Sequence, residues 1–394
     1  MKITDVNIEG VGGINNITLN LDDELNIICG PNGIGKSTII EAISLVFNRY
    51  ANPKIKKNVE SERGQVKLKL SDNNEEYDLV SPVKPSIPDE SSYAHHSVLN
   101  PKKVIKFDIQ RHFEYQRLDA LKADSKRSEQ DINTQITNGV LLKDIKEWLA
   151  KRHLFSKVED GYSEKTLLNL ELAKKCISSL HSAYVFSRVN PKTYDVFVKT
   201  PNGEIWYEYL SSGFKSCISL LVGIIKEIEI RFPEEDELAI NFDGIILIDE
   251  LELHLHPEWQ SRITEVLTET FPRAQFIVST HSPHVVQNAK PNQIITLERS
   301  DNGQTQVREP LGAATGYTGW TIDEVLRDVM GMESTLSRNL QQKLDEFYML
   351  IDVEDYARAS KAYAYLDTIL HPRNVLRKSL SMSLDLIKDS PEEP

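Results

Sequence analysis

Apolar and polar residues alternate with a period of two near the start of the chain, a pattern typical of β-strands with one buried face. The alternation covers residues 2–8 and 17–21, which are joined through three glycines and therefore predict an antiparallel strand pair. Residues 65–70 and 77–80 alternate in the same way around an Asp-Asn-Asn turn. We therefore expect two hairpins before the helical part of the chain.

The middle of the chain changes from strand to helix periodicity. After a loop marked by three prolines and a short strand at residues 104–109, residues 117–187 carry apolar positions at helical spacing. Two amphipathic helices are predicted, one from residues 141–149 and one from residues 167–180. Because this stretch is short and poor in heptads, we expect a compact helical lobe and not a long coiled-coil arm.

The next part alternates buried strands with helices. Residues 245–248 and 275–278 are continuous apolar runs, and helices are predicted at residues 216–232 and 258–271. Strands that are apolar on both faces and alternate with helices indicate a parallel sheet covered on both sides. An Asn-Gly turn at position 202 predicts a further hairpin ahead of these elements.

Beyond residue 310 a glycine-rich loop leads into helices predicted at residues 322–330, 336–350 and 356–370, followed by a polar tail. The whole pattern predicts an α/β protein with a mixed parallel sheet, an antiparallel N-terminal sheet, a helical insertion and a helical C-terminal tail. We expect four segments along the chain. They are a first lobe at 1–110, a helical insertion at 111–190, a second lobe at 191–310 and a C-terminal helical region at 311–394.

Length and charge narrow the class of protein. With 394 residues the chain is long enough for one large core with additions. Its net charge of −13 disfavours broad, sequence-independent binding to duplex nucleic acid, although it is compatible with a local basic patch. Three scattered cysteines argue against a disulfide framework. Because no secretory leader or membrane-spanning apolar run is recognisable, we expect a soluble cytoplasmic protein.

The segment Gly30-Pro31-Asn32-Gly33-Ile34-Gly35-Lys36-Ser37 fits the phosphate-binding P-loop pattern G-x-x-x-x-G-K-[ST]. It lies between an apolar strand and a helical pattern, the context that the motif requires. Its glycines let backbone N–H groups turn toward a β-phosphate, Lys36 adds charge at the β- and γ-phosphates, and the Ser37 hydroxyl binds Mg²⁺. We therefore predict ATP and Mg²⁺ as ligands. The predicted contacts are Asn32, Gly33, Gly35, Lys36, Ser37 and Thr38.

The apolar run at residues 245–248 ends in Asp249 and Glu250, the form of a Walker B strand. Asp249 is predicted to complete the Mg²⁺ shell, and Glu250 to orient and polarise the attacking water. The alternative is a core strand that runs into an acidic loop. The P-loop in the same chain favours the catalytic interpretation.

The segment Leu210-Ser211-Ser212-Gly213 opens a helix between the P-loop and the Walker B strand. Taken alone, a Ser-Ser-Gly at a helix start is an ordinary N-cap. At this place, however, the chain resembles the ATP-binding-cassette superfamily, whose L-S-G-G-Q signature occupies the same position. The resemblance implies that Ser211 and Gly213 contact the γ-phosphate bound by the opposite subunit. Because Phe214 and Lys215 replace the family's polar fifth residue, this contact is left to Lys215 or to the backbone.

The same resemblance implies three further features of the site. His281, at the end of the second buried strand, matches the switch histidine that touches the γ-phosphate. Gln110 is the candidate for the glutamine loop that reaches Mg²⁺ and water, with Arg111 as a competitor. His254 and His256 form an H-x-H that suggests a metal site, but their segment also aligns with the superfamily D-loop, and no further ligands follow at suitable spacing.

Three features resemble one branch of the superfamily. They are the N-terminal strand pair, the D-loop ending in His256-Pro257, and the segment Ser279-Thr280-His281-Ser282-Pro283. They are similar to the non-transporter ATPases related to overcoming-lysogenization-defect proteins and to the RecF, Rad50 and SMC heads. Residues 344–359 are similar to the helical tail of PtuA-like ATPases of Septu and retron anti-phage systems, with an ordinary helical hairpin as the alternative.

The resemblance implies a P-loop ATPase of ABC or SMC-head type that works as a homodimer. Glu250, His281 and Gln110 are the predicted catalytic residues, and Ser37, Asp249 and Gln110 the predicted metal ligands. Such a chain would convert ATP and water to ADP and phosphate as the sensor of a prokaryotic anti-phage system. It would control a separate effector such as a PtuB-like HNH nuclease, with a retron reverse transcriptase and its msDNA as further partners. We expect no nuclease domain in this chain, because too few residues follow Pro283.

Two other functions stay open. One is a RecF- or Rad50-like ATPase that binds DNA in repair, and the other is a nucleotide-stabilised scaffold with little hydrolysis, which Phe214 in the signature would suit. The first would use basic residues of the helical lobe, for which a solvated helix face is the alternative. These residues are Lys122, Lys126, Arg127, Lys143, Lys146, Lys151 and Arg152.

Overall fold

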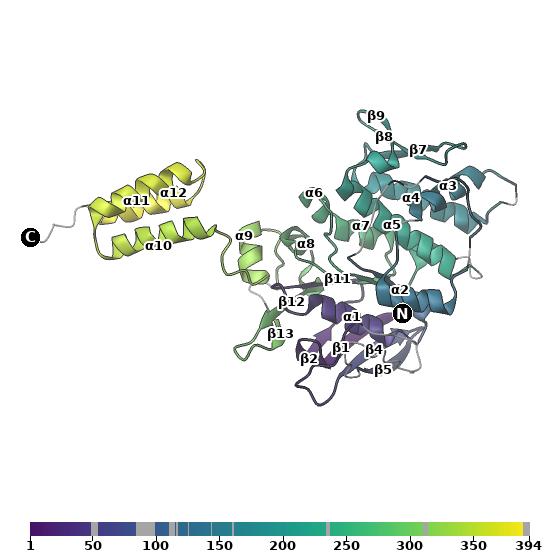
Figure 1. Cartoon of the computed structure of the whole chain (residues 1–394), viewed down its shortest axis with the longest axis horizontal. Coiled ribbons are helices and arrows are strands. Elements are labelled where there is room, and N and C mark those ends of the chain that lie inside the picture. The colour runs from purple at the N-terminus through teal and green to yellow at the C-terminus, as the bar shows by residue number, and fades with distance from the viewer. Residues whose placement is uncertain are drawn as a thin grey trace, which may run out of the picture. The chain divides into compact units, whose positions relative to one another are not determined.

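The structure is a computed structural model that divides into two compact units, Met1–Gly331 and Met332–Pro394 (Figure 1). The larger unit extends past residue 310, where the sequence predicts the start of the C-terminal region. The structure describes residues 1–48, 54–83, 99–109, 115, 117–124, 126–142, 144–159, 161–233, 237–309 and 314–388.

A six-stranded sheet forms the centre of the larger unit. Neighbouring strands are parallel except at one edge, where β12 and β13 pair antiparallel. In spatial order the strands are β13 (Thr305–Arg308), β12 (Ile294–Arg299), β3 (Leu25–Cys29), β11 (Gln275–Ser279), β10 (Ile245–Ile248) and β6 (Val104–Phe107). The order confirms the predicted mixed sheet and places the P-loop strand β3 directly beside β11.

Both faces of this sheet are buried, which explains the continuous apolar runs. In β10, Ile246 and Ile248 belong to one apolar cluster, whereas Ile245 and Leu247 belong to another. Successive strand residues point to opposite faces, so a strand covered on both sides must be apolar throughout.

Different layers cover the two faces (Figure 1). On one side lie the helices α3 (Ile145–Phe155), α4 (Glu164–Leu180), α5 (Ser212–Arg231), α7 (Ile263–Thr270) and α8 (Pro283–Gln287). On the other side lie the helices α1 (Lys36–Val46) and α2 (Glu129–Asn138) and the four-stranded antiparallel sheet. In spatial order the strands of that sheet are β2 (Ile14–Asn20), β1 (Lys2–Val11), β4 (Gln65–Asp72) and β5 (Glu75–Pro82). Both predicted hairpins are therefore confirmed.

The helical lobe departs from the prediction in two places. Residues 185–187, predicted as helical, belong to strand β7 (Val185–Val189), which pairs with β8 (Val196–Thr200) next to β9 (Gly203–Trp206) in a third sheet. Residues 117–124 are also not helical. Leu121 packs against the core of the lobe without being in a helix, so burial alone does not distinguish the two conformations.

Two predicted helices of the larger unit are broken. The helix expected at residues 258–271 is divided into α6 (Pro257–Gln260) and α7, and the first helix after residue 310 consists of α9 (Ile322–Glu324) and a π-helical stretch at Val325–Val329. Arg262 stands at the first break, where its guanidinium donates to the Leu180 carbonyl at 2.9 Å. That contact joins α7 to the end of α4.

The smaller unit is a bundle of three helices, α10 (Arg338–Asp352), α11 (Tyr356–Ile369) and α12 (Leu376–Leu386). The sequence analysis missed α12. Three serines between its leucines lower its intrinsic helix propensity. The unit nevertheless has its own core, made of Leu344, Phe347, Ala359, Leu366, Leu370, Leu380, Leu384 and Ile387.

Candidate active site

The P-loop joins β3 to α1 with a backbone that requires glycine. Gly30 has φ 142°, and a Cβ there would lie 2.4 Å from the carbonyl oxygen of Leu297 in β12. Gly33 has φ 71°, and a Cβ built on it would meet open space. The space beside Gly33 is therefore open, as expected for a loop whose backbone N–H groups approach phosphate.

Two neighbours hold the loop in this shape. The Thr305 hydroxyl donates to the Ile34 carbonyl at 2.9 Å, and the Arg299 guanidinium donates to the Gly33 carbonyl at 3.2 Å. Arg299 lies in β12 and Thr305 in β13, and both are far from the P-loop in sequence. Of the other predicted contacts, Asn32 is exposed and Thr38 is partly buried in the first turn of α1.

Lys36 is buried at the start of α1. Its ammonium donates to the carbonyl oxygens of Gly30 and Pro31, each at 2.8 Å. Burial lowers the pKa of Lys36, and the negative charges of Glu252 and Asp249 oppose this shift. The cation therefore lies inside the loop that it is predicted to serve.

Asp249 and Ser37 meet at the carboxyl end of the central sheet. The Ser37 hydroxyl donates to Asp249 Oδ1 at 3.1 Å, and the Ser279 hydroxyl donates to the same oxygen at 2.5 Å. The P-loop, the Walker B strand and the strand that leads to the switch histidine thus converge on one carboxylate. Hydroxyl and carboxylate oxygens are ligands that Mg²⁺ accepts, so this pair fits the predicted metal.

Glu250 is held in an unusual backbone conformation. Its φ is 50°, in the left-handed region that residues other than glycine rarely occupy. Its N–H donates to the Ser279 hydroxyl at 2.8 Å, and the next N–H, that of Leu251, donates to the Ser279 carbonyl at 2.9 Å. Neighbouring structure therefore fixes the strained turn, as is common at functional sites.

Glu252 joins this turn to the switch segment. One carboxylate oxygen accepts from the Thr280 hydroxyl at 2.7 Å, and the other accepts from the N–H of His281 at 2.5 Å. His281 itself is exposed. Partial desolvation of the imidazole and the positive charge of Lys36 lower the pKa of His281, which favours a neutral ring.

The signature segment opens α5, the longest helix of the lobe. The Ser211 side chain caps the helix by accepting from the N–H of Phe214 at 3.3 Å, and Ser211 and Ser212 are both exposed. Gly213 is buried against the loop after Walker B, since a Cβ there would lie 2.9 Å from the His254 carbonyl oxygen. The N-terminus of α5 is therefore rigidly seated while its first serines face outward.

The two departures from the signature pattern have structural roles. Phe214 is buried and packs against Trp259 and Tyr184, with ring centroids 5.3 and 4.6 Å away. Lys215 donates to the Glu208 carbonyl at 2.9 Å. Phe214 therefore anchors α5 in the core, and the exposed part of the motif is the pair of serines.

Two protein families match this chain. A family described as "AAA domain" matches residues 5–183, and one described as "AAA domain, putative AbiEii toxin, Type IV TA system" matches residues 187–287. The "Septu protein PtuA" of Bacillus thuringiensis is 39% identical over 387 residues, which cover 98% of both chains. The chain belongs to the PtuA family. It is therefore an ABC-type ATPase, as its P-loop, Walker B and signature segments predict.

Other matches cover smaller parts of this chain. The "Retron Ec83 probable ATPase" of Escherichia coli is 30% identical over 242 residues, which are 61% of this chain and 41% of that protein. Among solved structures, the "SMC head domain from Thermotoga maritima" has a TM-score of 0.46 at 18% identity. It covers 78% of this chain and 98% of that one.

Some predicted residues remain outside the assembled group. Gln110 and Arg111 both lie outside the described residues, which resume at Tyr115 after Ile109. His254 has φ 64° in the D-loop, and His256 caps α6 by accepting from the N–H of Glu258 at 3.4 Å. Within the part of the chain that the structure describes, no group of three or more His, Cys, Asp and Glu side chains could hold a metal ion.

Most described cations of the helical lobe are paired inside the chain. Lys146 contacts Asp195 at 2.7 Å and Glu208 at 2.6 Å, and Arg152 contacts Glu229 at 2.5 Å. Lys151 and Arg152 both contact Asp124, and Arg127 contacts Glu227. Lys143 lies outside the described residues. These cations therefore form ion pairs within the lobe, so fewer of them are available to contact DNA, which weakens the DNA-binding alternative.

The sequence analysis did not include Ser279 and Glu252 among the site residues. Both are positioning residues, since they hold Asp249, Glu250 and His281 through hydrogen bonds. Their place inside the Walker B and switch segments was the available signal.

As for a membrane location, every helix in the described ranges is too short or too polar to span a bilayer.

Proposed function

We propose that this chain is a homodimeric ATPase that regulates a separate effector protein in an anti-phage defence system. In this proposal each composite site takes the P-loop, Walker B and switch residues from one subunit and the signature serines from the other. Binding of ATP closes the dimer, and hydrolysis to ADP and phosphate opens it.

The convergence of three segments on Asp249 carries the proposal. Ser37, Asp249 and Ser279 form one hydrogen-bonded group beside the buried Lys36. Lys36 would hold the β- and γ-phosphates, since its ammonium lies inside the loop that surrounds them. Ser37 and Asp249 would hold Mg²⁺, which when bound neutralises charge on the phosphate oxygens.

Glu250 and His281 would act on the water and on the γ-phosphate. Glu250 follows Asp249 in a fixed turn, and its negative charge acts to raise the pKa of Lys36, so its carboxylate lies near the P-loop lysine. From there it would orient the attacking water and accept its proton. A neutral His281 would donate a hydrogen bond to the γ-phosphate, for which its lowered pKa is suitable.

A second subunit is part of the proposal because the signature serines are exposed. Ser211 and Ser212 face outward at the N-terminus of a helix of 20 residues, where backbone N–H groups and the helix dipole favour an anion. A chain has one P-loop and one signature. Two copies related by a twofold axis would give two complete sites.

The defence role rests on the family. The chain is similar along almost its whole length to a Septu protein and over part of its length to retron ATPases. We propose the same setting for this chain, with an HNH nuclease as the effector and a retron reverse transcriptase with its msDNA as a further partner.

Two substitutions test the catalytic part of the proposal. Lys36→Ala should abolish ATP binding, whereas Glu250→Gln should keep ATP binding within about threefold and lower kcat by about 10²-fold or more. Isothermal titration calorimetry and a phosphate-release assay measure these effects. Glu269→Gln, at an exposed position on α7, is the matched control and should change neither quantity. Equal kcat for wild type and Glu250→Gln would refute the assignment of Glu250.

A further inference from the structure

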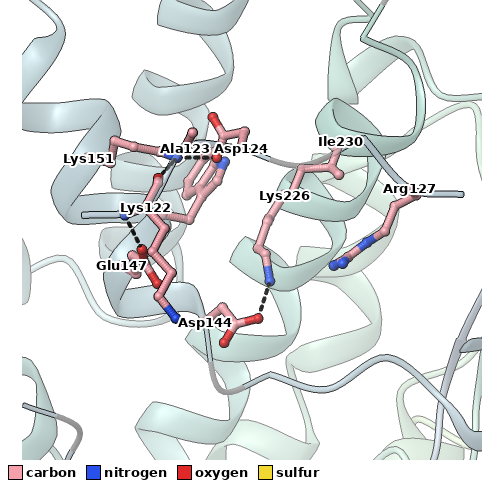
Figure 2. A pocket seen from close by; sticks show the side chains of 10 residues that line it. Lys122, Ala123, Asp124, Arg127, Asp144, Glu147, Lys151, Lys226 and Ile230 are labelled. Carbon is pink, nitrogen blue, oxygen red and sulfur yellow. Dashed lines mark hydrogen bonds and ion pairs between the residues drawn. The ribbon is translucent and has the colours of Figure 1, made fainter. Parts of the chain in front are cut away.

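A cavity of about 200 Å³ lies on the helical lobe, between α3, α5, residues 122–124 and Arg127. Figure 2 shows Lys226 between Arg127 on one side and the side chains of Lys122 and Lys151 on the other. Four cations line the cavity against three carboxylates, Asp124, Asp144 and Glu147. The balance is therefore +1, from four positive and three negative groups.

Lys226 reaches this cavity from the buried face of α5. The residue is only 4% exposed, and its ammonium lies 3.7 Å from Asp144 and 4.0 Å from Glu227. Both distances exceed that of a normal hydrogen bond. Burial lowers the pKa of Lys226, and the charges of Glu227 and Asp144 only oppose this. Among the residues that the structure describes, Asp144 at 3.7 Å is the nearest charged partner of this buried ammonium, so the site favours an added anion that approaches more closely.

Arg127 supplies a second incompletely paired donor. Its Nη2 contacts Glu227 at 2.7 Å, but its buried Nε has no hydrogen-bond partner among the described residues. Glu227 is fully buried and is shared with Arg231, whose Nε lies 3.4 Å away. Three cations, Arg127, Lys226 and Arg231, therefore share the buried carboxylate of Glu227, and Asp144 is the next carboxylate near Lys226.

Two of the three lining carboxylates already have close partners. Asp124 contacts Lys151 and Arg152, and Glu147 accepts from the N–H of Lys122 at 2.7 Å. Asp144 is the one that approaches Lys226, with a side chain that is 43% exposed (Figure 2). Asp144 is thus placed to move aside when a stronger acceptor enters.

We propose that this cavity binds the phosphate group of a small phosphorylated ligand, with Lys226 and Arg127 as its donors. Phosphate oxygens accept strong hydrogen bonds from ammonium and guanidinium groups. The volume suits inorganic phosphate, pyrophosphate or the phosphate end of a mononucleotide better than a whole dinucleotide, since drug-sized ligands occupy about 300–1,000 Å³. The P-loop is a separate site, built on α1 at the other face of the sheet.

The position of the cavity gives it a regulatory role. Lys226 and Ser211 lie on the same helix, so a ligand at Lys226 contacts the element that carries the signature serines. In this proposal α5, which is continuous from Ser212 to Arg231, carries a shift at Lys226 to the signature serines. This role rests on the proposed ATPase function, whereas ligand binding itself does not.

Binding is tested in a Lys36→Ala background, which removes phosphate binding at the P-loop. Calorimetric titration with inorganic phosphate, pyrophosphate and AMP should give one site per chain for at least one of them. Lys226→Met should weaken this binding by about tenfold or more, and Arg127→Gln should do the same in a protein that keeps Lys226. Asp144→Asn should tighten binding, because it removes the competing charge.

The control is Lys175→Ala, which removes an exposed lysine of α4 outside the cavity and should leave the affinity unchanged. Melting temperatures identify variants that fail to fold, and Arg127→Gln provides the second test if Lys226→Met is destabilised by the loss of a charge beside Glu227 and Asp144. Unchanged affinity in both Lys226→Met and Arg127→Gln would overturn the proposal. So would the absence of any small-ligand binding, including the case in which only a 5′-phosphorylated oligonucleotide binds.

The regulatory role has its own readout. Saturating amounts of the ligand that binds should change the ATPase rate of the otherwise wild-type chain and leave that of Lys226→Met unchanged. An identical response of both proteins would overturn the regulatory role. Since the binding arm uses a chain without a functional P-loop, a failure of the ATPase proposal leaves the binding result intact.

Discussion

Ser279 connects the two acidic residues that the proposed chemistry requires. Its hydroxyl donates to Asp249 and accepts from the N–H of Glu250, so one oxygen fixes both the carboxylate and the strained turn. Serine is suited to this position because a hydroxyl can donate and accept at once. The geometry of the site thus depends on a residue that would contact no substrate.

Ser279→Ala should therefore impair turnover more than binding. The substitution removes the hydroxyl that accepts from the N–H of Glu250 and donates to Asp249, which should lower the free energy of unfolding by about 1–3 kcal/mol. We expect kcat to fall by about 10-fold to 100-fold while the affinity for ATP changes by less than about threefold. Chemical denaturation and steady-state kinetics measure the two effects. Ser187→Ala, at an exposed position in β7, is the control, and an equal loss there would contradict the role of Ser279.

A second prediction concerns Gly213, where α5 and the D-loop approach each other closely. A Cβ at this position would lie 2.9 Å from the His254 carbonyl and 3.0 Å from the His256 nitrogen, both of them backbone atoms. Gly213→Ala should push α5 away from the D-loop and cost about 1–3 kcal/mol. Thermal melting measures the loss. Gly13→Ala is the matched control, since its Cβ would meet nothing within 4 Å, and a melt of Gly213→Ala as high as this control would refute the contact.

At the scale of elements, the helical lobe is held by ion pairs between segments distant in sequence. Asp124, which lies outside the helices and strands, contacts Lys151 and Arg152 on α3, and Arg152 also contacts Glu229 on α5. Burial alone would raise the pKa of Asp124, but hydrogen bonds from Lys151 and Arg152 bring the pKa below its ordinary value. The ionised carboxylate therefore stabilises the folded lobe.

This shift predicts how stability depends on pH. A carboxyl group whose pKa is lowered on folding contributes stability above its unfolded pKa and loses it as the pH falls through the folded pKa. Asp124→Asn should lower stability at pH 7 by about 1–2 kcal/mol, given that the side chain is partly exposed. The difference from wild type should shrink below about pH 4, the ordinary range for aspartate.

Urea denaturation between pH 3 and pH 7 measures this dependence. The matched control is Asp119→Asn, because Asp119 pairs with Arg117 at 3.3 Å but is 85% exposed. It should cost little at any pH. A loss for Asp124→Asn that stays constant down to pH 3 would contradict the role of its charge.

The same lobe shows where sequence patterns stop being informative. The motif elements β3, β10 and β11 were predictable because their chemistry is local: a glycine loop, an apolar strand and the residues that follow it. The lobe's lysines and arginines looked like a solvated or DNA-binding face, since Glu227 is 100 residues from Arg127 and no local pattern reveals such a pairing. Burial and partner come from the tertiary fold.

The candidate site divides in the same way. Lys36, Ser37 and Asp249 come together as their motifs imply, but the bonds from Ser279 and Glu252 depend on strand order. Sequence indicated a weak signature at Phe214, whereas the structure buries this ring in the core. α12 was not predicted because its three serines lower the helix propensity of the segment, although its leucines belong to the core of the smaller unit.

At the scale of the whole molecule, a nucleotide site shared between two copies means that one chain alone is incomplete. The signature serines are exposed at the start of α5, and the proposal assigns them to the nucleotide of a second copy. Two inactive variants with defects on opposite sides of this interface should therefore complement each other. Lys36→Ala removes the nucleotide grip of its own site, and Ser211→Arg blocks the contact made to the partner's nucleotide.

The decisive measurement is the ATPase rate of a mixture of these two variants after subunit exchange. Each homodimer should be inactive, but half of the dimers formed by random exchange carry one intact composite site, so activity should recover to about a quarter of wild type. A mixture of Lys36→Ala with Lys36→Ala/Ser211→Arg has no intact site and serves as the control. If the first mixture stays as inactive as its components, with exchange verified by differently tagged chains, nucleotide is not shared between two copies and the central claim is wrong.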